Sequence, residues 1–189
     1  MTSRVILLRI ALLDVTPRVW RRLRVPEAIA LDQLHLLIQA AMGWSDTHLH
    51  EFFILDQRYG SRAALGASTG GRLRESRGKP LCHALGASRS FDYLYDFGDQ
   101  WHHLVVVESI DTLAEGVEPE AALLAGGGAC PPEDVGGAAG YASFLAALAD
   151  PAHPQHAEQL AWVGGAFDPH VFDLEAAAAC VSRLAASAG

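Results

Sequence analysis

The sequence lacks the features of a membrane protein and of a disulfide-stabilised secreted domain. None of its apolar runs approaches the roughly 20 residues that a membrane-spanning helix needs. The apolar stretch over residues 5–13 is interrupted by Arg9 and is not followed by a small-residue cleavage site, so it does not fit a signal peptide. Cysteine occurs only at Cys82, Cys130 and Cys180. Such an odd, widely spaced set predicts reduced thiols in a cytoplasmic protein.

Several familiar motifs are missing as well. The chain has no G-x-x-x-x-G-K-[ST] phosphate-binding loop, no G-x-G-x-x-G dinucleotide fingerprint and no H-E-x-x-H zinc-binding helix. The cysteines also lack the Cys-x-x-Cys spacing of a structural zinc site. Nucleotide hydrolysis by the familiar route is therefore not expected, and no motif marks the chain as a recombinase or a nuclease.

Basic residues are nearly absent from the second half of the chain. Residues 1–90 hold thirteen of the fourteen basic residues and seven acidic ones, a balance of +6. Residues 91–189 hold fifteen acidic residues and only Arg183, a balance of −14. This asymmetry indicates either a partner surface or two halves that pack together and neutralise each other. The net charge of −8 disfavours a nucleic-acid-binding surface over the whole molecule, which would be basic.

The remaining pattern is typical of one globular domain over residues 1–189. Half of the residues are hydrophobic and 19% are charged, which excludes a disordered chain. The hydrophobic periodicity predicts the α+β class. Strands are expected over residues 4–13, 19–25, 48–55, 91–97 and 101–110, and helices over 31–42, 140–149, 155–161 and 173–186.

Two of these segments support more detailed predictions. The helix over 31–42 has one apolar stripe, and Gly43 stands where a C-terminal cap is expected. The strand over 19–25 alternates in polarity, which puts Arg21 on the same face as the strand's apolar residues.

Residues 56–90 lose this periodicity and become rich in glycine, serine, alanine and arginine. They contain half of all the basic residues of the chain. We therefore predict a long, mobile, basic loop here, with one short helical turn over residues 81–85.

Unusual polar residues gather in three short runs, the first of which is His48-Leu49-His50-Glu51. Two histidines at positions i and i+2 of a strand point to the same face, so His48 and His50 could converge on one metal ion. The alternative is that both histidines form structural hydrogen bonds.

The second run extends from Tyr93 to His103 and combines carboxylates, histidines and aromatic residues around Gly98. If Gly98-Asp99 is a two-residue turn, Asp96 lies opposite Trp101, and a longer turn would shift this register. The run could be a structural hairpin, or a polar rim where a carboxylate orients a histidine for acid–base or metal chemistry.

The third run is Cys130-Pro131-Pro132-Glu133-Asp134, a proline-stiffened loop with a thiol and two adjacent carboxylates. A cysteine nucleophile would need a histidine that only folding could bring close. Rigidity conferred by the prolines is the alternative reading of this run.

The three runs together define a candidate cleft with three open functions. It could belong to a non-enzymatic binding or accessory module. It could instead hold a divalent metal in a hydrolytic enzyme that uses His48 and His50 with Asp96, Asp99, His103 or Glu133, and His48, His50 and Asp96 are the first candidate ligands. A third possibility is DNA association through the arginine-rich segment 58–89, which would be strongly salt-dependent. The candidate cleft residues are His48, His50, Glu51, Tyr95, Asp96, Asp99, Trp101, His102, His103, Cys130, Glu133 and Asp134.

A set of motifs in order along residues 4–180 resembles a known family. The motifs are Pro17-Arg18-Val19-Trp20-Arg21-Arg22, Met42-Gly43-Trp44, His48-Leu49-His50-Glu51-Phe52, the run from Phe91 to His103, Cys130 to Gly137, Trp162, and Phe167-Asp168-Pro169. Together they resemble the plasmid pRiA4b ORF-3-like family. The resemblance implies an α+β fold with a mainly antiparallel sheet flanked by helices. It implies little about activity, although some members are labelled passenger proteins of mobile insertion elements. Segment 56–90 is longer and more basic than the family pattern.

Overall fold

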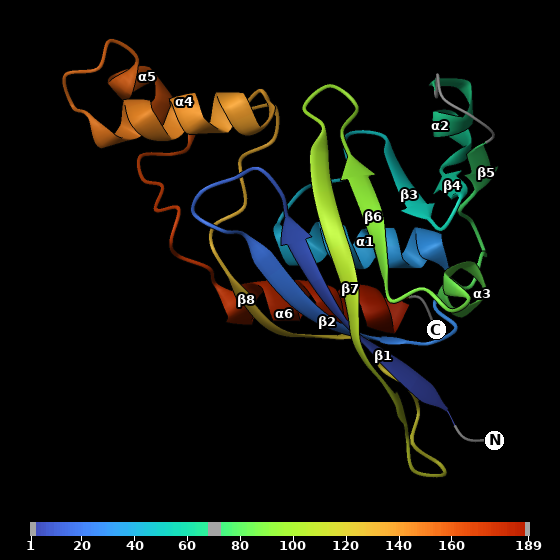
Figure 1. The fold of residues 1–189 in the computed structure, drawn as a ribbon. Coiled ribbons are helices and arrows are strands. Elements are labelled where there is room, and N and C mark those ends of the chain that lie inside the picture. Colours follow the sequence, from blue (N-terminus) through green and yellow to red (C-terminus); the bar gives the residue numbers. More distant parts are fainter. Residues whose placement is uncertain (1–2, 68–72, 188–189) are drawn as a thin grey trace.

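An eight-stranded, mostly antiparallel sheet organises the part of the chain that the structure describes, residues 3–67 and 73–187 of a computed structural model (Figure 1). The strands run in the order β5-β4-β3-β6-β7-β1-β2-β8, and the β4–β5 pair is parallel. The strands are β1 Arg4–Leu12, β2 Trp20–Pro26, β3 His50–Ile54, β4 Gln57–Gly60, β5 Leu73–Glu75, β6 Ser90–Tyr95, β7 Trp101–Thr112 and β8 Ala122–Gly127.

The helices flank this sheet and confirm the α+β prediction of a single domain. Helices α1 and α6 contact each other on one face of the sheet, and α6 also contacts β8 (Figure 1). Helices α4 and α5 pack together beyond one end of the sheet, while α2 and α3 lie near β4 and β5. Among the described residues, no helix has the length and apolar character needed to cross a membrane. The helices are α1 Leu31–Met42, α2 Arg62–Ala67, α3 Leu81–Leu85, α4 Gly137–Ala149, α5 His156–Trp162 and α6 Leu174–Ser187.

The predicted helix over 31–42 is confirmed as α1. Its buried stripe includes Leu34 and Ile38, and Gly43 caps it in the left-handed conformation with φ of 94°. A second buried face carries His35 and Gln39, whose side chains both contact the hydroxyl of Tyr93. The helix therefore contributes polar groups as well as apolar ones to the space between helix and sheet.

Strand β2 confirms that Arg21 lies on the core face. Arg21 is fully buried, and its guanidinium donates to three backbone carbonyls, those of Trp20, Ala41 and Gly127. The ring of Phe172 stacks over it at 3.6 Å. Burial lowers the pKa of Arg21 to about 10, which still leaves it charged at neutral pH. The Ala41 carbonyl belongs to the last turn of α1, where the helix dipole favours a cation.

The prediction of one long loop over residues 56–90 is wrong. This segment contains the short elements β4, α2, β5 and α3, and the helical turn predicted over 81–85 is confirmed as α3. Residues 68–72 lie outside the described part of the chain. The strands escaped prediction because three or four residues are too few for a visible period. They depend instead on tertiary pairing, of β4 with β3 and of β5 with β4.

The connection between β6 and β7 is longer than two residues, so the register conditional on a Gly98-Asp99 turn does not apply and the shifted alternative does. Tyr95, and not Asp96, lies opposite Trp101, so residues 96–100 make the connection. Asp96 and Gln100 both adopt positive φ values, 57° and 55°, and the Gln100 N–H donates to the Asp96 carbonyl. This register places Asp96 outside the ladder, where its side chain can face other loops.

Candidate functional site

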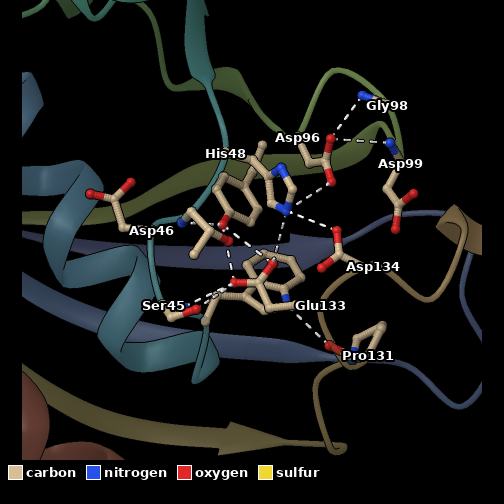
Figure 2. Close-up of polar contacts among 12 residues, drawn as sticks. Ser45, Asp46, His48, Asp96, Gly98, Asp99, Pro131, Glu133 and Asp134 are labelled. Atoms are coloured by element: carbon tan, nitrogen blue, oxygen red, sulfur yellow. Dashed lines mark hydrogen bonds and ion pairs between the residues drawn. The ribbon is translucent and has the colours of Figure 1, made fainter.

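The three polar runs meet at one end of the sheet through four side chains (Figure 2). His48 comes from the loop before β3, Asp96 from the β6–β7 connection, and Glu133 and Asp134 from the loop between β8 and α4. The His48 Nε2 atom lies 3.1 Å from Asp134 Oδ1, 3.6 Å from Asp96 Oδ2 and 3.9 Å from Glu133 Oε2. We call these four residues the His48 cluster.

Asp96 is held by its own turn. Its Oδ1 atom accepts hydrogen bonds from the backbone N–H groups of Gly98 at 2.8 Å and Asp99 at 3.3 Å. Its own N–H donates to the Leu49 carbonyl, which ties the turn to the loop that carries His48. The Oδ2 atom is left facing His48.

Glu133 is anchored in the same manner. Its Oε1 atom accepts from the Ser45 N–H at 2.9 Å, the Ser45 hydroxyl at 3.3 Å and the Tyr95 hydroxyl at 3.1 Å. Burial raises the pKa of Tyr95 to about 12, so this phenol remains a hydrogen-bond donor. Oε2 accepts only a longer contact from the same Tyr95 hydroxyl, at 3.3 Å, and is the oxygen that faces His48.

The loop that carries Glu133 and Asp134 is docked onto the rest of the site at two points. Trp44 Nε1 donates to the Pro131 carbonyl at 2.9 Å, and the Gly136 N–H donates to Asp99 Oδ2 at 3.0 Å. Asp99 therefore positions the loop and does not join the His48 cluster. Asp134 adopts a positive φ of 58°, and its side chain is 73% exposed, so the cluster opens to solvent on this side.

His48 Nε2 is enclosed by these carboxylates but lacks a hydrogen bond within the described residues. One ligand atom each from His48, Asp96 and Asp134 lies within 4.8 Å of the others. Atoms bonded to one ion at about 2 Å are separated by about 3–4 Å, which matches the contacts of Nε2. Within the described chain, no lysine or arginine forms an ion pair with the three carboxylates. A divalent cation would supply the missing positive charge.

His50 does not share this cluster, so the predicted convergence of His48 and His50 is wrong. Strand β3 begins only at His50, and His48 precedes it, so the alternation of strand side chains does not apply to the pair. His50 is buried and stacks on His35, with ring centroids 3.4 Å apart. Asp46 completes this second group, in which His35 Nε2 lies 2.7 Å from Asp46 Oδ1. Burial lowers the pKa of His35 to about 4 and that of His50 to about 3.

Glu51 and His102 lie away from the cluster, on the opposite face of the sheet. Glu51 pairs with Arg58 of β4, and His102 contacts Asp92 at 2.9 Å. Both follow from strand alternation, because the neighbouring residues in β3 and β7 point into the core.

Trp101 and His103 are core residues behind the site. Both are essentially buried, and the Trp44 ring contacts each of them. The Nδ1 atom of His103 lies 3.2 Å from the Tyr93 carbonyl. Burial lowers the pKa of His103 to about 4, which keeps it neutral.

Cys130 lacks the setting of a nucleophile. Burial raises the pKa of its thiol, so the reactive thiolate is suppressed even though the Arg21 charge opposes this shift. Cys130, Cys82 and Cys180 are all free thiols in the described structure.

Three residues in or beside these two groups were missed by sequence reasoning. Ser45 holds Glu133 through its backbone N–H and its hydroxyl, and a single loop serine gives no signal of such a role. Asp46 stands in a loop with a positive φ of 56°. His35 had a visible signal, since it shares a helix face with Gln39 and a buried polar helix face requires partners.

The geometry of the basic segment does not test DNA association. Arg58 is engaged by Glu51, whereas Arg74 and Arg77 are exposed at or beside the edge strand β5. Arg72 lies outside the described residues. DNA association therefore stays a prediction.

Comparisons with known proteins give relatives along nearly the whole chain. The sequence model described as "Plasmid pRiA4b ORF-3-like protein" matches residues 4–176. "Uncharacterized protein y4hQ" of Sinorhizobium fredii (strain NBRC 101917 / NGR234) is 42% identical over 186 residues, which cover 97% of this chain and 90% of the relative. A crystal structure of Methanosarcina mazei Go1 protein MM3350, titled a protein of unknown function, has a TM-score of 0.81 and 34% identity. That match covers 93% of this chain and 98% of the other.

Proposed function

The chain belongs to the plasmid pRiA4b ORF-3-like family, and we propose that it is a binding or accessory module whose His48 cluster takes a divalent cation. The relatives named above carry no activity in their names, so this proposal depends on the side chains of the cluster. Carboxylate oxygens suit Mg²⁺ and Mn²⁺, and one imidazole also admits Zn²⁺. The oxygen-rich composition makes Mn²⁺ a suitable probe.

One observation carries the proposal. Asp96 Oδ1 is held by backbone N–H groups and Glu133 Oε1 by Ser45 and Tyr95, while Asp96 Oδ2 and Glu133 Oε2 face His48 Nε2. Glu133 Oε2 has one longer hydrogen bond, from the Tyr95 hydroxyl at 3.3 Å. Carboxylates that served only as turn caps would not need second oxygens directed at a common imidazole. Donors that fix one oxygen and leave the other directed inward are the outer contacts that orient metal ligands.

Removing a ligand is expected to weaken Mn²⁺ binding by at least tenfold, on the scale seen when metal-site contacts are lost. His48→Ala removes the imidazole, and Asp134→Asn removes one charge at an exposed position where asparagine also tolerates positive φ. Binding to chelator-treated protein would be followed by the electron paramagnetic resonance signal of free Mn²⁺.

His102→Ala is the matched control because His102 also contacts a carboxylate but lies on the opposite face of the sheet. It should bind Mn²⁺ like the natural chain. Equal affinity in the natural chain, His48→Ala and Asp134→Asn would overturn the proposal, as would Mn²⁺ binding too weak to detect at millimolar concentration.

Metal-dependent hydrolysis is a second candidate, favoured by the exposure of Asp134. A cation held beside a 73% exposed side chain would keep coordination positions open to water, which a hydrolytic metal needs. Turnover of p-nitrophenyl phosphodiester or ester probes with Mn²⁺, lost in His48→Ala, would support it. Absence of turnover by Mn²⁺-loaded protein would contradict hydrolysis and leave cation binding as the proposed function.

A further inference from the structure

A second group of potential ligands lies beside the His48 cluster but shares none of its members. His35 of α1, Asp46 of the following loop and His50 of β3 each place a ligand atom within 4.8 Å of the other two. We call them the His50 cluster. It contains two imidazoles and one carboxylate, so it is richer in nitrogen than the His48 cluster.

His50 is the member whose hydrogen bonding is incomplete. His50 is only 5% exposed, and its Nε2 atom is buried without a hydrogen-bond partner in the described chain. Leaving a buried polar atom unpaired costs about 1–3 kcal/mol. A ligand for Nε2 would remove this cost.

The other two members are oriented by a buried network that ends on one glutamine. His35 Nδ1 lies 2.7 Å from the Tyr93 hydroxyl, which accepts a hydrogen bond from Gln39 Nε2 at 3.0 Å. The Gln39 Oε1 atom accepts from the Asp46 N–H at 3.1 Å. A partner on the far nitrogen of a histidine is the contact that orients metal-ligating imidazoles.

A solvent-connected hollow gives an ion access to these atoms. It has a volume of about 430 Å³, and its lining includes all three members of the cluster together with Thr47 and Ser61. An entry path and oriented ligands are both required of a metal site that is assembled by folding.

We propose that His35, Asp46 and His50 form a second metal site, selective for a transition-metal ion of the Zn²⁺ or Co²⁺ type. Imidazole suits such ions, whereas Mg²⁺ prefers oxygen ligands. Three protein ligands of this composition leave at least one coordination position free, as in zinc sites with two histidines and a carboxylate. The two rings are stacked with centroids 3.4 Å apart and planes 13° from parallel, so binding one ion requires the imidazoles to rotate out of this stack.

The test is a Co²⁺ titration of chelator-treated full-length chain, followed by visible absorption and by metal content after desalting. Asp46→Asn removes the carboxylate charge at a partly exposed position and keeps a residue that tolerates φ of 56°. His50→Phe removes the nitrogen ligands while keeping an aromatic ring against His35. Both variants are expected to lose one equivalent of Co²⁺, or to bind it at least tenfold more weakly, even in excess Mg²⁺.

Asp134→Asn separates this site from the His48 cluster. It should leave the Co²⁺ spectrum of the His50 cluster unchanged, so failure of one site is distinguishable from failure of the other. Co²⁺ binding that is identical in the natural chain and in Asp46→Asn would overturn the second site. That variant alone decides the outcome if His50→Phe does not fold.

Discussion

Lowering the pH from 7.5 to 5.5 is expected to reduce the free energy of unfolding by about 4 kcal/mol, because three buried imidazoles are held neutral. Burial depresses the pKa of His35 and His103 to about 4 and that of His50 to about 3. In the unfolded chain each imidazole has a pKa of about 6.5 and is mostly protonated at pH 5.5. Each therefore contributes about 1.4 kcal/mol to the loss.

The direction follows from proton binding in the two states. Below pH 6.5 these imidazoles bind protons in the unfolded chain but stay neutral in the folded chain, so acid favours unfolding. The stabilisation is complete above pH 6.5 and is lost as the pH falls towards about 4, where His35 and His103 begin to titrate in the folded protein.

Urea denaturation at pH 7.5, 6.5 and 5.5, in the presence of a chelator, measures this dependence without a contribution from bound metal. His103→Gln should remove about one third of the pH-dependent loss, because it removes one of the three imidazoles. His102→Gln is the matched substitution at an exposed histidine on the other face, outside the set of three buried imidazoles. A free energy of unfolding that is equal at pH 7.5 and 5.5 would contradict buried neutral histidines.

Gly137→Ala is expected to destabilise the protein by about 3 kcal/mol and to weaken cation binding at the His48 cluster at least tenfold. Gly137 has φ of 67°, and a Cβ atom there would lie 2.5 Å from the backbone oxygen of Asp99. The left-handed conformation costs a non-glycine residue about 1–2 kcal/mol, and overpacking against backbone adds about 1–3 kcal/mol. Relief of the clash would move the loop that carries Glu133 and Asp134 away from His48.

The neighbouring glycine provides a matched control. Gly136 also has positive φ, at 92°, but a Cβ atom there would come no closer than 3.5 Å to the Gly140 Cα. Gly136→Ala should therefore cost only the conformational part, about 1–2 kcal/mol, and should leave Mn²⁺ affinity nearly unchanged. Denaturation and Mn²⁺ titration of both variants would decide. Equal effects of the two substitutions would show that close approach to Asp99 does not set the loop position.

The elements that could be predicted were those whose own residues carry the pattern. Helix α1 has a continuous buried stripe and a glycine cap, and β2 alternates over its length. Strand β8 was missed because its sequence ends in small residues that only tertiary packing explains. A Cβ atom at Gly126 would lie 2.3 Å from the Phe172 ring, and one at Gly127 would lie 2.8 Å from Trp20 Nε1.

The sequence predicts which residues form the site, but it does not predict which of them contact one another. The sequence pointed to all four members of the cluster, His48, Asp96, Glu133 and Asp134. It paired His48 with the wrong residue, His50. The pairing depends on where β3 begins and on a five-residue connection in which Asp96 and Gln100 take positive φ without being glycine. Neither property follows from local residue preference, since each is stabilised by contacts with segments distant along the chain.

The interior place of β1 in the sheet, between β2 and β7, has a consequence for biosynthesis. Strand β1 pairs with β2 soon after both are made, but its other edge waits for β7, as in the pairing of Leu12 with His103. At translation rates of about 5–20 residues per second, that wait lasts about 5–20 s. During this interval the nascent hairpin has an unpaired strand edge. It also exposes residues that are buried in the folded protein, such as Leu8 and Ile10. Emergence of β7 from the ribosome is thus the step that ends the exposure of this edge and joins the two halves of the sheet.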